Sequence, residues 1–219
     1  MILARVISLV IGYVFGLFQT GYFYGKSQGI DIHKEGSGNV GTTNSLRVLG
    51  IKAGLITFLG DLFKAILAVV LVWLLFRGRY PEEIRVLGLY AGFGAVLGHN
   101  FPFYLGFRGG KGIACTSGMI LAVVPQAAPV CLVLFLLAVA ITRYVSLGSI
   151  LVVSFYLIQV ILFGQVGWFL HLSGAPLYEF YLVSACFTVM ALWRHRENIV
   201  RLIHGTENKL GGAKKEKGE

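Results

Sequence analysis

Charged residues are scarce in this chain of 219 residues, where only 13% are Asp, Glu, Lys or Arg. Hydrophobic residues make up 56%, and the mean hydropathy is +0.76. Soluble domains carry about a quarter of their residues as charged side chains, so the composition excludes an ordinary soluble protein. Apolar runs of roughly bilayer-crossing length recur along the chain, without the alternation typical of a membrane β-barrel. The sequence therefore predicts a polytopic helical membrane protein.

Cysteine is rare as well, with three residues that all lie in apolar segments. There is no C-x-x-C pair and no zinc-ligand spacing, so we expect neither a disulfide framework nor a metal site, and no cofactor. Acidic residues are few, ten against nineteen Lys and Arg, which gives a net charge of +9. The basic residues gather in loops and in the tail. Cytoplasmic loops of membrane proteins are rich in Lys and Arg, which accounts for the positive charge, so no nucleic-acid partner is expected.

Seven apolar segments define the predicted topology. The stretch 113–142 is open to two interpretations, one long span or two short helices that meet near Pro125 and Pro129. Seven spans place the polar clusters and the basic C-terminus on one face, whereas six would split them, so the basic bias favours seven. The segments are Ile2–Tyr24, Ile51–Phe76, Ile84–Leu97, Ile113–Pro125, Ala127–Thr142, Leu147–Trp168 and Tyr178–Trp193.

The expected fold is thus all-α, with about seven transmembrane helices, the N-terminus outside and the C-terminus cytoplasmic. Residues 1–207 would form a single integral-membrane domain, and residues 208–219 a basic, disordered cytoplasmic tail. The tail would lie near anionic lipid head groups.

The most informative stretch is Gly36–Arg47, which joins the first two apolar runs. It is rich in glycine, amide and hydroxyl side chains and ends in an arginine. Glycine lets backbone N–H groups turn toward an anion, and arginine adds a charged, bidentate donor. This composition predicts oxyanion binding at a membrane surface, which a mere connection between spans would not need.

Two further clusters have the same character. Gly98–Gly112 carries Gly109 and Gly110 between two cations, directly before a predicted helix whose N-terminus would be positive. It is not a Walker loop, because Gly112 stands where the magnesium-binding Ser or Thr would be. The third cluster, Arg194–Glu207, follows the last span. Taken alone, the second cluster could be a flexible basic loop and the third a basic anchor helix.

Asp61 and Lys64 lie inside the second apolar run, three residues apart. Asp61 is about 15 Å along the axis from the start of that run and therefore near the middle of a bilayer. Ionisable residues at this depth are costly and usually face a polar interior with a partner. A structural pair and a functional pair are both open.

Together these residues resemble the bacterial PlsY family of membrane acyl-phosphate:glycerol-3-phosphate acyltransferases. The first motif would be Ser37-Gly38-Asn39-x-Gly41-x-Thr43-Asn44-x-x-Arg47, and the second Gly98-His99-x-x-Pro102 with Gly106–Gly112. The third would be Arg194-His195-x-x-Asn198-Ile199-x-Arg201-Leu202-x-x-Gly205-x-Glu207. Departures include Val40 in place of a frequent proline and Arg108 in place of the usual lysine.

The resemblance implies transfer of a fatty acyl group from acyl phosphate to the sn-1 hydroxyl of glycerol 3-phosphate, which yields lysophosphatidate and phosphate. It implies an active site on the cytoplasmic face of the bacterial inner membrane, and we expect a monomer. The implied catalytic residues are Ser37, Asn39, His99, His195 and Asn198. The implied glycerol 3-phosphate site is Ser37, Thr43, Asn44, Arg47, His195, Asn198 and Arg201. The implied acyl phosphate site is Arg108, Gly109, Gly110, Lys111 and Gly112.

The proton acceptor stays open at this point, between a histidine and a phosphate oxygen of a substrate. The His-x4-Asp motif of acyltransferases with soluble donors does not occur after any histidine. The main alternative is a membrane transporter for an anionic phosphorylated metabolite, which would also explain cationic loops and intramembrane charges.

Overall fold

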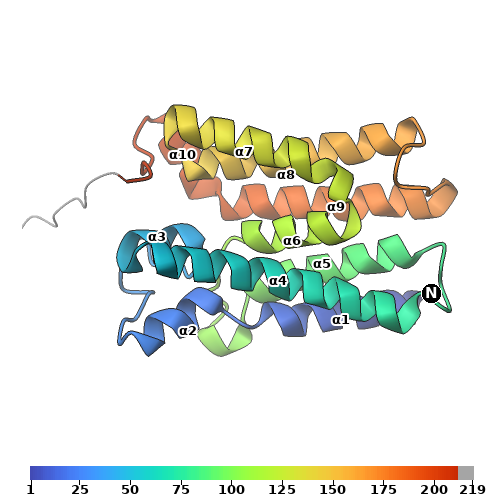
Figure 1. Cartoon of the computed structure of the whole chain (residues 1–219), viewed down its shortest axis with the longest axis horizontal. Coiled ribbons are helices and arrows are strands. Elements are labelled where there is room, and N and C mark those ends of the chain that lie inside the picture. The colour runs from blue at the N-terminus through green and yellow to red at the C-terminus, as the bar shows by residue number, and fades with distance from the viewer. Residues whose placement is uncertain (212–219) are drawn as a thin grey trace, which may run out of the picture.

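The structure, a computed structural model, describes residues 1–211 and is helical throughout that part of the chain (Figure 1). The prediction of an all-α chain is confirmed for these residues. The helices are α1 (Ile2–Gly16), α2 (Thr20–Ser27), α3 (Thr42–Leu49), α4 (Ile51–Phe76), α5 (Ile84–Asn100), α6 (Ile113–Val123), α7 (Ala128–Thr142), α8 (Val145–Gln165), α9 (Gly174–Arg194) and α10 (Arg196–Ile203). Short 3-10 turns cover Phe103–Leu105 (η1) and Pro125–Ala127 (η2).

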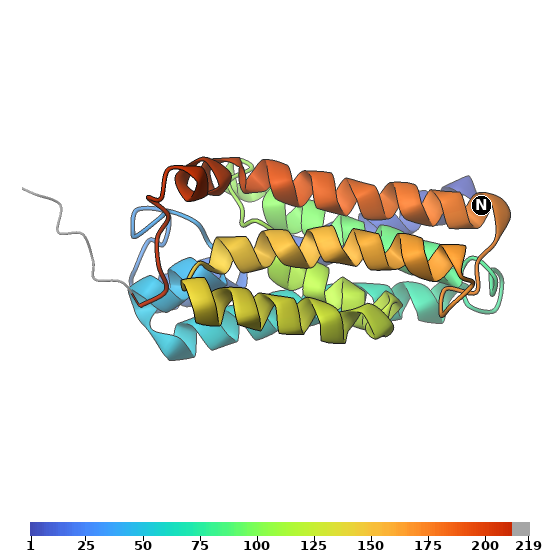
Figure 2. The ribbon, with the colours of Figure 1, turned by 90° about the horizontal axis from the view of Figure 1, so that it is seen from above.

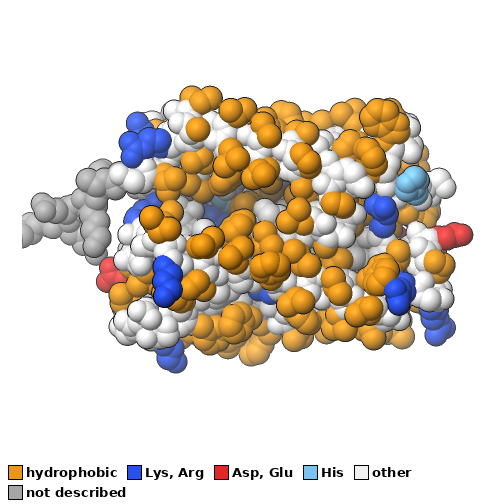
Figure 3. Space-filling view, in the orientation of Figure 1, with side chains coloured by type: hydrophobic (Ala, Val, Ile, Leu, Met, Phe, Trp, Pro, Cys, Tyr) orange, Lys and Arg blue, Asp and Glu red, His pale blue; other side chains and the backbone are white. Residues whose placement is uncertain are grey.

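Five helical segments of the described chain are long and apolar enough to cross a membrane. Many of their large hydrophobic side chains are exposed, and apolar side chains cover most of the face shown in Figure 3, with charged side chains concentrated toward its two ends. Exposed apolar surface of this extent is stable only in lipid, so the chain is a multi-pass membrane protein. The segments are Ile2–Ser27, Ile51–Phe76, Pro125–Thr142, Val145–Gln165 and Gly174–Arg194.

The long helices lie along one axis, and successive members of the series α1, α4, α5, α6, α7, α8 and α9 run in opposite directions (Figures 1 and 2). The ambiguous stretch forms two short helices, α6 and α7, rather than one long one. Pro125 begins the turn between them and Pro129 lies in the first turn of α7. Proline is favoured in a first turn because its missing N–H has no helical partner there.

The predicted first span, Ile2–Tyr24, is not one continuous helix, because the chain breaks between α1 and α2. Buried side chains take up carbonyls at the break. The Gln19 side-chain amide donates to the carbonyls of Gly16, Gly98 and His99 at 3.1–3.3 Å, and Lys64 donates to the carbonyl of Phe18 at 2.6 Å. Polar side chains stabilise the break where water is absent.

Glycines bring α1 and α5 close together. A Cβ added at Gly12 would lie 1.9 Å from the Ala91 carbonyl oxygen, and one at Gly98 would lie 2.2 Å from that of Tyr13. Small residues spaced by four are typical of such close crossings in membranes. This contact fixes the end of α5, and with it His99, against the break in α1.

One end of the bundle collects the polar segments. Residues 28–41, α3, residues 101–112 and α10 lie toward it, and the N-terminus lies at the other end (Figures 1 and 2). Part of the predicted tail is described: the Leu210 carbonyl accepts hydrogen bonds of 3.0 and 2.7 Å from the Arg143 guanidinium. The rest of that tail, residues 212–219, lies outside the described residues.

Candidate active site

A cavity of about 920 Å³ opens among the polar segments and continues between the helices. Its polar end is lined by residues from all three clusters found in the sequence. Its apolar part runs between α4, α6, α7 and α8. The polar lining includes Ser37, Asn39, Thr42, Thr43, Asn44, Arg47, Asp61, His99, Lys111, Gly112, His195, Asn198, Arg201 and Glu207. The three clusters therefore meet at one site.

The first cluster forms a loop and the short helix α3. Some of its polar side chains line the cavity with groups free for a ligand, and others are hydrogen-bonded within the protein. Ser37, Thr43 and Arg47 line the cavity, and no carboxylate of the described chain lies within salt-bridge distance of Arg47. The Asn39 side-chain oxygen accepts a 2.9 Å hydrogen bond from the Gly41 N–H. Arg47 thus offers an unneutralised guanidinium to an anion in the cavity.

Asn44 is engaged with the protein itself. Its side-chain oxygen accepts from the Ser37 N–H at 2.8 Å, and its NH₂ group donates to the carbonyls of Glu35 and Ile32 at 3.0 and 3.5 Å. The side chain is only 2% exposed. Since its donors and acceptor are occupied, Asn44 holds the preceding loop in place and thereby positions Ser37.

Gly109 and Gly110 also serve the fold. Their N–H groups donate to the carbonyls of Asn100 and His99, and their carbonyls accept from the Arg194 guanidinium at 2.6–3.1 Å. A Cβ at Gly110 would lie 2.0 Å from Nε2 of His99. The glycines let this loop pack directly on His99, and their amides are not free to hold a phosphate as the sequence suggested.

Lys111 lies directly after these glycines and faces the third cluster. Its ammonium group donates to the Asn198 side-chain oxygen. Burial, and then the positive charge of Arg201, lower the pKa of Lys111 to about 8. Gly112, in the left-handed region at φ +80°, ends the loop and begins α6. The first N–H groups of a helix have no partner within it, so Lys111 and the start of α6 together form an anion-binding corner.

Arg108 lies apart from this corner. It is exposed, and it lines a second, smaller depression together with residues of α2 and the loop that follows. The structure therefore does not bring Arg108 together with the other residues expected to hold acyl phosphate.

His195 is buried at the junction of α9 and α10. Its Nδ1 is 2.8 Å from the Ala191 carbonyl oxygen, which requires the proton to lie on Nδ1 and leaves Nε2 as an acceptor. Burial, and then the nearby Lys111 ammonium, lower the pKa of His195 to about 4. The imidazole is therefore neutral at physiological pH and can accept a hydrogen bond in the cavity.

The residue that the sequence reasoning missed is Glu207. Its carboxylate accepts 2.9 Å hydrogen bonds from the Asn198 NH₂ and from the Arg201 guanidinium, and its side chain is 5% exposed. It fixes both side chains on the face of α10 that meets Lys111. Glu207 was part of the third motif, but its spacing alone gave no sign of these partners.

Below the glycine loop, Asp61, Lys64 and His99 form one buried network. The Lys64 ammonium lies 2.8 Å from an Asp61 oxygen and 2.9 Å from Nδ1 of His99, and the Thr20 hydroxyl donates to the same Asp61 oxygen at 3.1 Å. With its bond to Phe18, Lys64 uses all three protons. Because Nδ1 of His99 accepts from Lys64, its proton lies on Nε2, and His99 cannot act as a base in this state.

The apolar part of the cavity follows α6 from Ile113 to the turn at Pro125, about 18 Å along a helix axis. Two hydroxyl groups on the cavity wall, Thr42 Oγ and Ser146 Oγ, are buried and have no hydrogen-bond partner within residues 1–211. Buried polar groups are normally paired, so these two unpaired hydroxyls are exceptions within the described residues. The remaining walls are aliphatic or aromatic and include Phe58, Leu62, Leu132, Phe135 and Val139.

Fold and cavity together define a multi-pass membrane protein with a cavity that has cationic and polar side chains at one end and an apolar groove at the other. The chain belongs to the glycerol-3-phosphate acyltransferase family, since the family model of that description matches residues 6–205.

Relatives of the same description support this assignment. The chain is 42% identical to a glycerol-3-phosphate acyltransferase of Halalkalibacterium halodurans, over 94% of this chain and 96% of the relative. It is 41% identical to one of Clostridioides difficile, over 97% and 98%. Two crystal structures of PlsY, an integral membrane glycerol 3-phosphate acyltransferase, are similar at 30% identity and 94% coverage of each chain. The TM-score is 0.79 for the glycerol 3-phosphate form and 0.77 for the lysophosphatidic acid form.

Proposed function

We propose that this chain transfers a fatty acyl group from an acyl phosphate to the sn-1 hydroxyl of glycerol 3-phosphate. One observation carries the proposal: a single cavity joins a cation-lined polar end to an apolar groove. Both reactants are anionic, and one also carries a long aliphatic chain. The relatives solved with glycerol 3-phosphate and with lysophosphatidic acid add to this support.

The acyl phosphate would place its phosphate against Lys111, the Gly112 backbone and the first N–H groups of α6. Its chain would lie in the groove between α4, α6, α7 and α8. Gly109 and Gly110 hold the loop that carries Lys111 in place through their backbone hydrogen bonds to α5 and to Arg194. Burying the chain is favourable by about 0.8 kcal/mol for each CH₂ removed from water.

Glycerol 3-phosphate would lie between the first and third clusters. Arg47 and Arg201 are the charged donors for its phosphate, and Lys111 stands between the two substrates. Ser37 and Thr43 contribute hydroxyl groups, and Asn198 completes the set from α10. Asn39 would turn its NH₂ group toward the reacting carbonyl as an oxyanion donor.

In the reaction, the sn-1 hydroxyl oxygen attacks the acyl carbonyl carbon, and the bond from that carbon to the phosphate oxygen breaks. The hydroxyl proton goes to a phosphate oxygen. Burial and the Lys111 ammonium lower the pKa of His195 to about 4, so the imidazole is a weak base and a substrate phosphate oxygen takes the proton in its place. His195 would orient the hydroxyl through Nε2. Because acyl phosphate is already activated, positioning and charge stabilisation supply most of the rate.

We also propose seven membrane crossings with the site on the cytoplasmic side of the bacterial inner membrane. The end of the bundle that carries the site also carries most Lys and Arg side chains. At the other end, Arg5 is bonded to Glu179, and Arg77 is stacked on Trp73. Positive charge is retained on the cytoplasmic side, which gives this orientation. A monomer is part of the same proposal.

The proposal is tested by purifying the protein in detergent and supplying palmitoyl phosphate and glycerol 3-phosphate without any thioester. We expect lysophosphatidate and phosphate in equal amounts. His195→Gln should keep measurable turnover, because the substrate phosphate takes the proton. Folded protein that forms no lysophosphatidate would refute the enzyme assignment. Uptake of glycerol 3-phosphate into sealed vesicles without acyl transfer would favour the transporter.

A further inference from the structure

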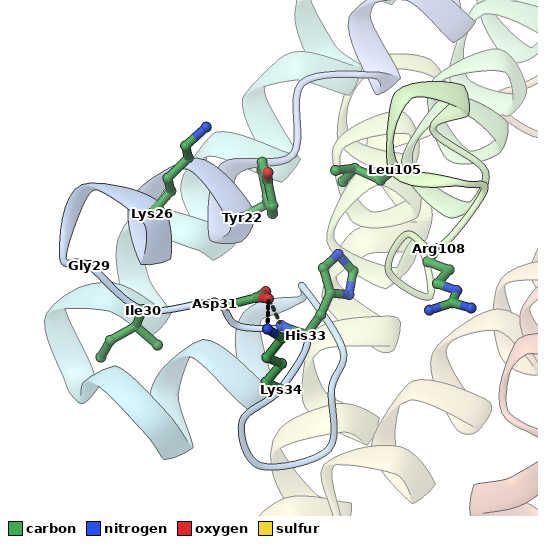
Figure 4. A pocket seen from close by; sticks show the side chains of 9 residues that line it. All are labelled: Tyr22, Lys26, Gly29, Ile30, Asp31, His33, Lys34, Leu105 and Arg108. Atoms are coloured by element: carbon green, nitrogen blue, oxygen red, sulfur yellow. Dashed lines mark hydrogen bonds and ion pairs between the residues drawn. The ribbon is translucent and has the colours of Figure 1, made fainter.

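A second depression, of about 650 Å³, lies outside the central cavity and is formed by two segments that are distant in the sequence (Figure 4). One is α2 with the loop that follows it, and the other is the loop that carries Arg108. None of its residues lines the central cavity. The residues are Tyr22, Lys26, Gly29, Ile30, Asp31, His33, Lys34, Leu105 and Arg108.

The depression is positively charged. Its lining includes three cations, Lys26, Lys34 and Arg108, and one carboxylate, that of Asp31. Asp31 is 3.7 Å from the Lys34 ammonium in a solvent-exposed pair, and such pairs contribute little. No carboxylate within residues 1–211 lies within salt-bridge distance of Arg108. Lys34 and Arg108 therefore offer cations from two segments that are distant in the sequence, whereas Lys26 points away from both (Figure 4).

Exposed aromatic side chains flank the depression. Phe103 and Phe107 are 59% and 60% exposed and lie two residues before and two residues after Leu105 in the chain. The ring of Tyr104 stacks on Phe23, with centroids 6.3 Å apart, and Phe23 stacks on Phe18 at 5.0 Å. Tyrosine is enriched at the level of lipid head groups, where its ring meets the hydrocarbon and its hydroxyl meets water. Tyr104, together with these exposed phenylalanines, is consistent with a depression at the membrane–water interface.

We propose that this depression binds the phosphodiester head group of an anionic phospholipid of the surrounding leaflet. The phosphate would lie against Arg108 and Lys34, with Lys26 at the edge of the depression, and the acyl chains would pass over the aromatic side chains. Arginine suits the site because it presents several donors to phosphate oxygens in a fixed plane. A soluble phosphate would gain the same charge contacts but nothing from the aromatic flank, which is why we assign the site to a lipid.

The test measures lipid binding to the full chain in detergent. Palmitoyl-oleoyl phosphatidylglycerol and the corresponding phosphatidylcholine are titrated separately, and bound lipid is counted by native mass spectrometry. We expect phosphatidylglycerol to bind at least tenfold more tightly than phosphatidylcholine. Arg108→Glu should weaken its binding at least tenfold, and Lys34→Glu should also weaken it.

The matched control is Lys52→Glu, which reverses an exposed charge at the start of α4 and should leave the affinity within twofold. Arg47→Glu reports on lipid in the central cavity and should also have no effect. Equal binding of the two lipids, or an equal loss in the Lys52 variant, would overturn the proposal. So would a loss confined to Arg47→Glu, or displacement of the lipid by millimolar inorganic phosphate.

Variants that keep the wild-type unfolding temperature report on the site and not on folding. The readout does not involve acyl transfer, so the outcome is independent of the proposed function. Arg108 lies outside the cavity proposed for catalysis.

Discussion

Glycerol 3-phosphate should bind progressively more weakly as the pH rises above 8, because Lys111 then loses its proton. Burial and the charge of Arg201 lower the pKa of Lys111 to about 8 in the free protein, from an ordinary value of 10.5. A bound phosphate dianion close to the ammonium favours the charged form and raises that pKa again. Affinity that depends on the cation is therefore fully present below pH 8 and is lost above it.

The magnitude follows from the fraction of free protein that carries the proton. If only the protonated form binds, the apparent dissociation constant rises by a factor of about 2 at pH 8 and about 11 at pH 9. Binding should take up about half a proton at pH 8 and nearly one at pH 9. The ligand itself does not interfere, because its second phosphate pKa is about 6 and it is a dianion throughout this range.

Calorimetric titration of the detergent-purified protein with glycerol 3-phosphate, in buffers of different ionisation enthalpy, gives both quantities. Lys111→Arg is the matched control, since the guanidinium stays charged and should abolish the pH dependence between 7 and 9. An affinity for wild-type protein that is constant between pH 7 and 9 would refute this reasoning. So would the same decline in the arginine variant.

Three substitutions test other parts of the site. Gly110→Ala places a Cβ 2.0 Å from the His99 ring and should lower acyl transfer at least about 100-fold in assays of folded protein. Gly78→Ala, in open space, should have no effect. Lys64→Met leaves the buried Asp61 carboxylate without its cation and Nδ1 of His99 without its donor, and should lower the unfolding free energy by about 3–5 kcal/mol, seen in thermal unfolding. Adding Asp61→Asn to this variant should restore part of the lost unfolding free energy. Glu207→Gln weakens the hold on Arg201 and should raise KM for glycerol 3-phosphate about tenfold, whereas exposed Glu197→Gln should not.

The helical segments and the grouping of the three clusters could be predicted from the sequence. Apolar runs report helices directly, because every backbone group in a bilayer must be paired within its own segment. The basic bias of the loops then placed the clusters on one face. Pro125 and Pro129 marked the turn between α6 and α7, although the sequence left two interpretations open.

The role of each individual residue within a cluster could not be predicted. Gly109 and Gly110 indicated amides for a phosphate, but these amides pair with α5, and the glycines are required because the loop packs on His99. Asn44 binds its own loop and Arg108 points to a different depression. Such outcomes depend on contacts between distant segments, as with Lys64 and the carbonyl at the break in α1. The order of residues along the chain does not reveal such contacts.

The proposed reaction requires one cavity to hold two phosphate-bearing molecules at once. The most direct measurement is the binding of glycerol 3-phosphate to purified protein, with and without a saturating, non-hydrolysable acyl phosphonate. Simultaneous binding of one molecule of each per chain is the predicted result, with the affinity for glycerol 3-phosphate retained in the presence of the phosphonate. Strict competition between the two molecules would contradict it, because a single phosphate site cannot bring the hydroxyl group to the acyl carbonyl.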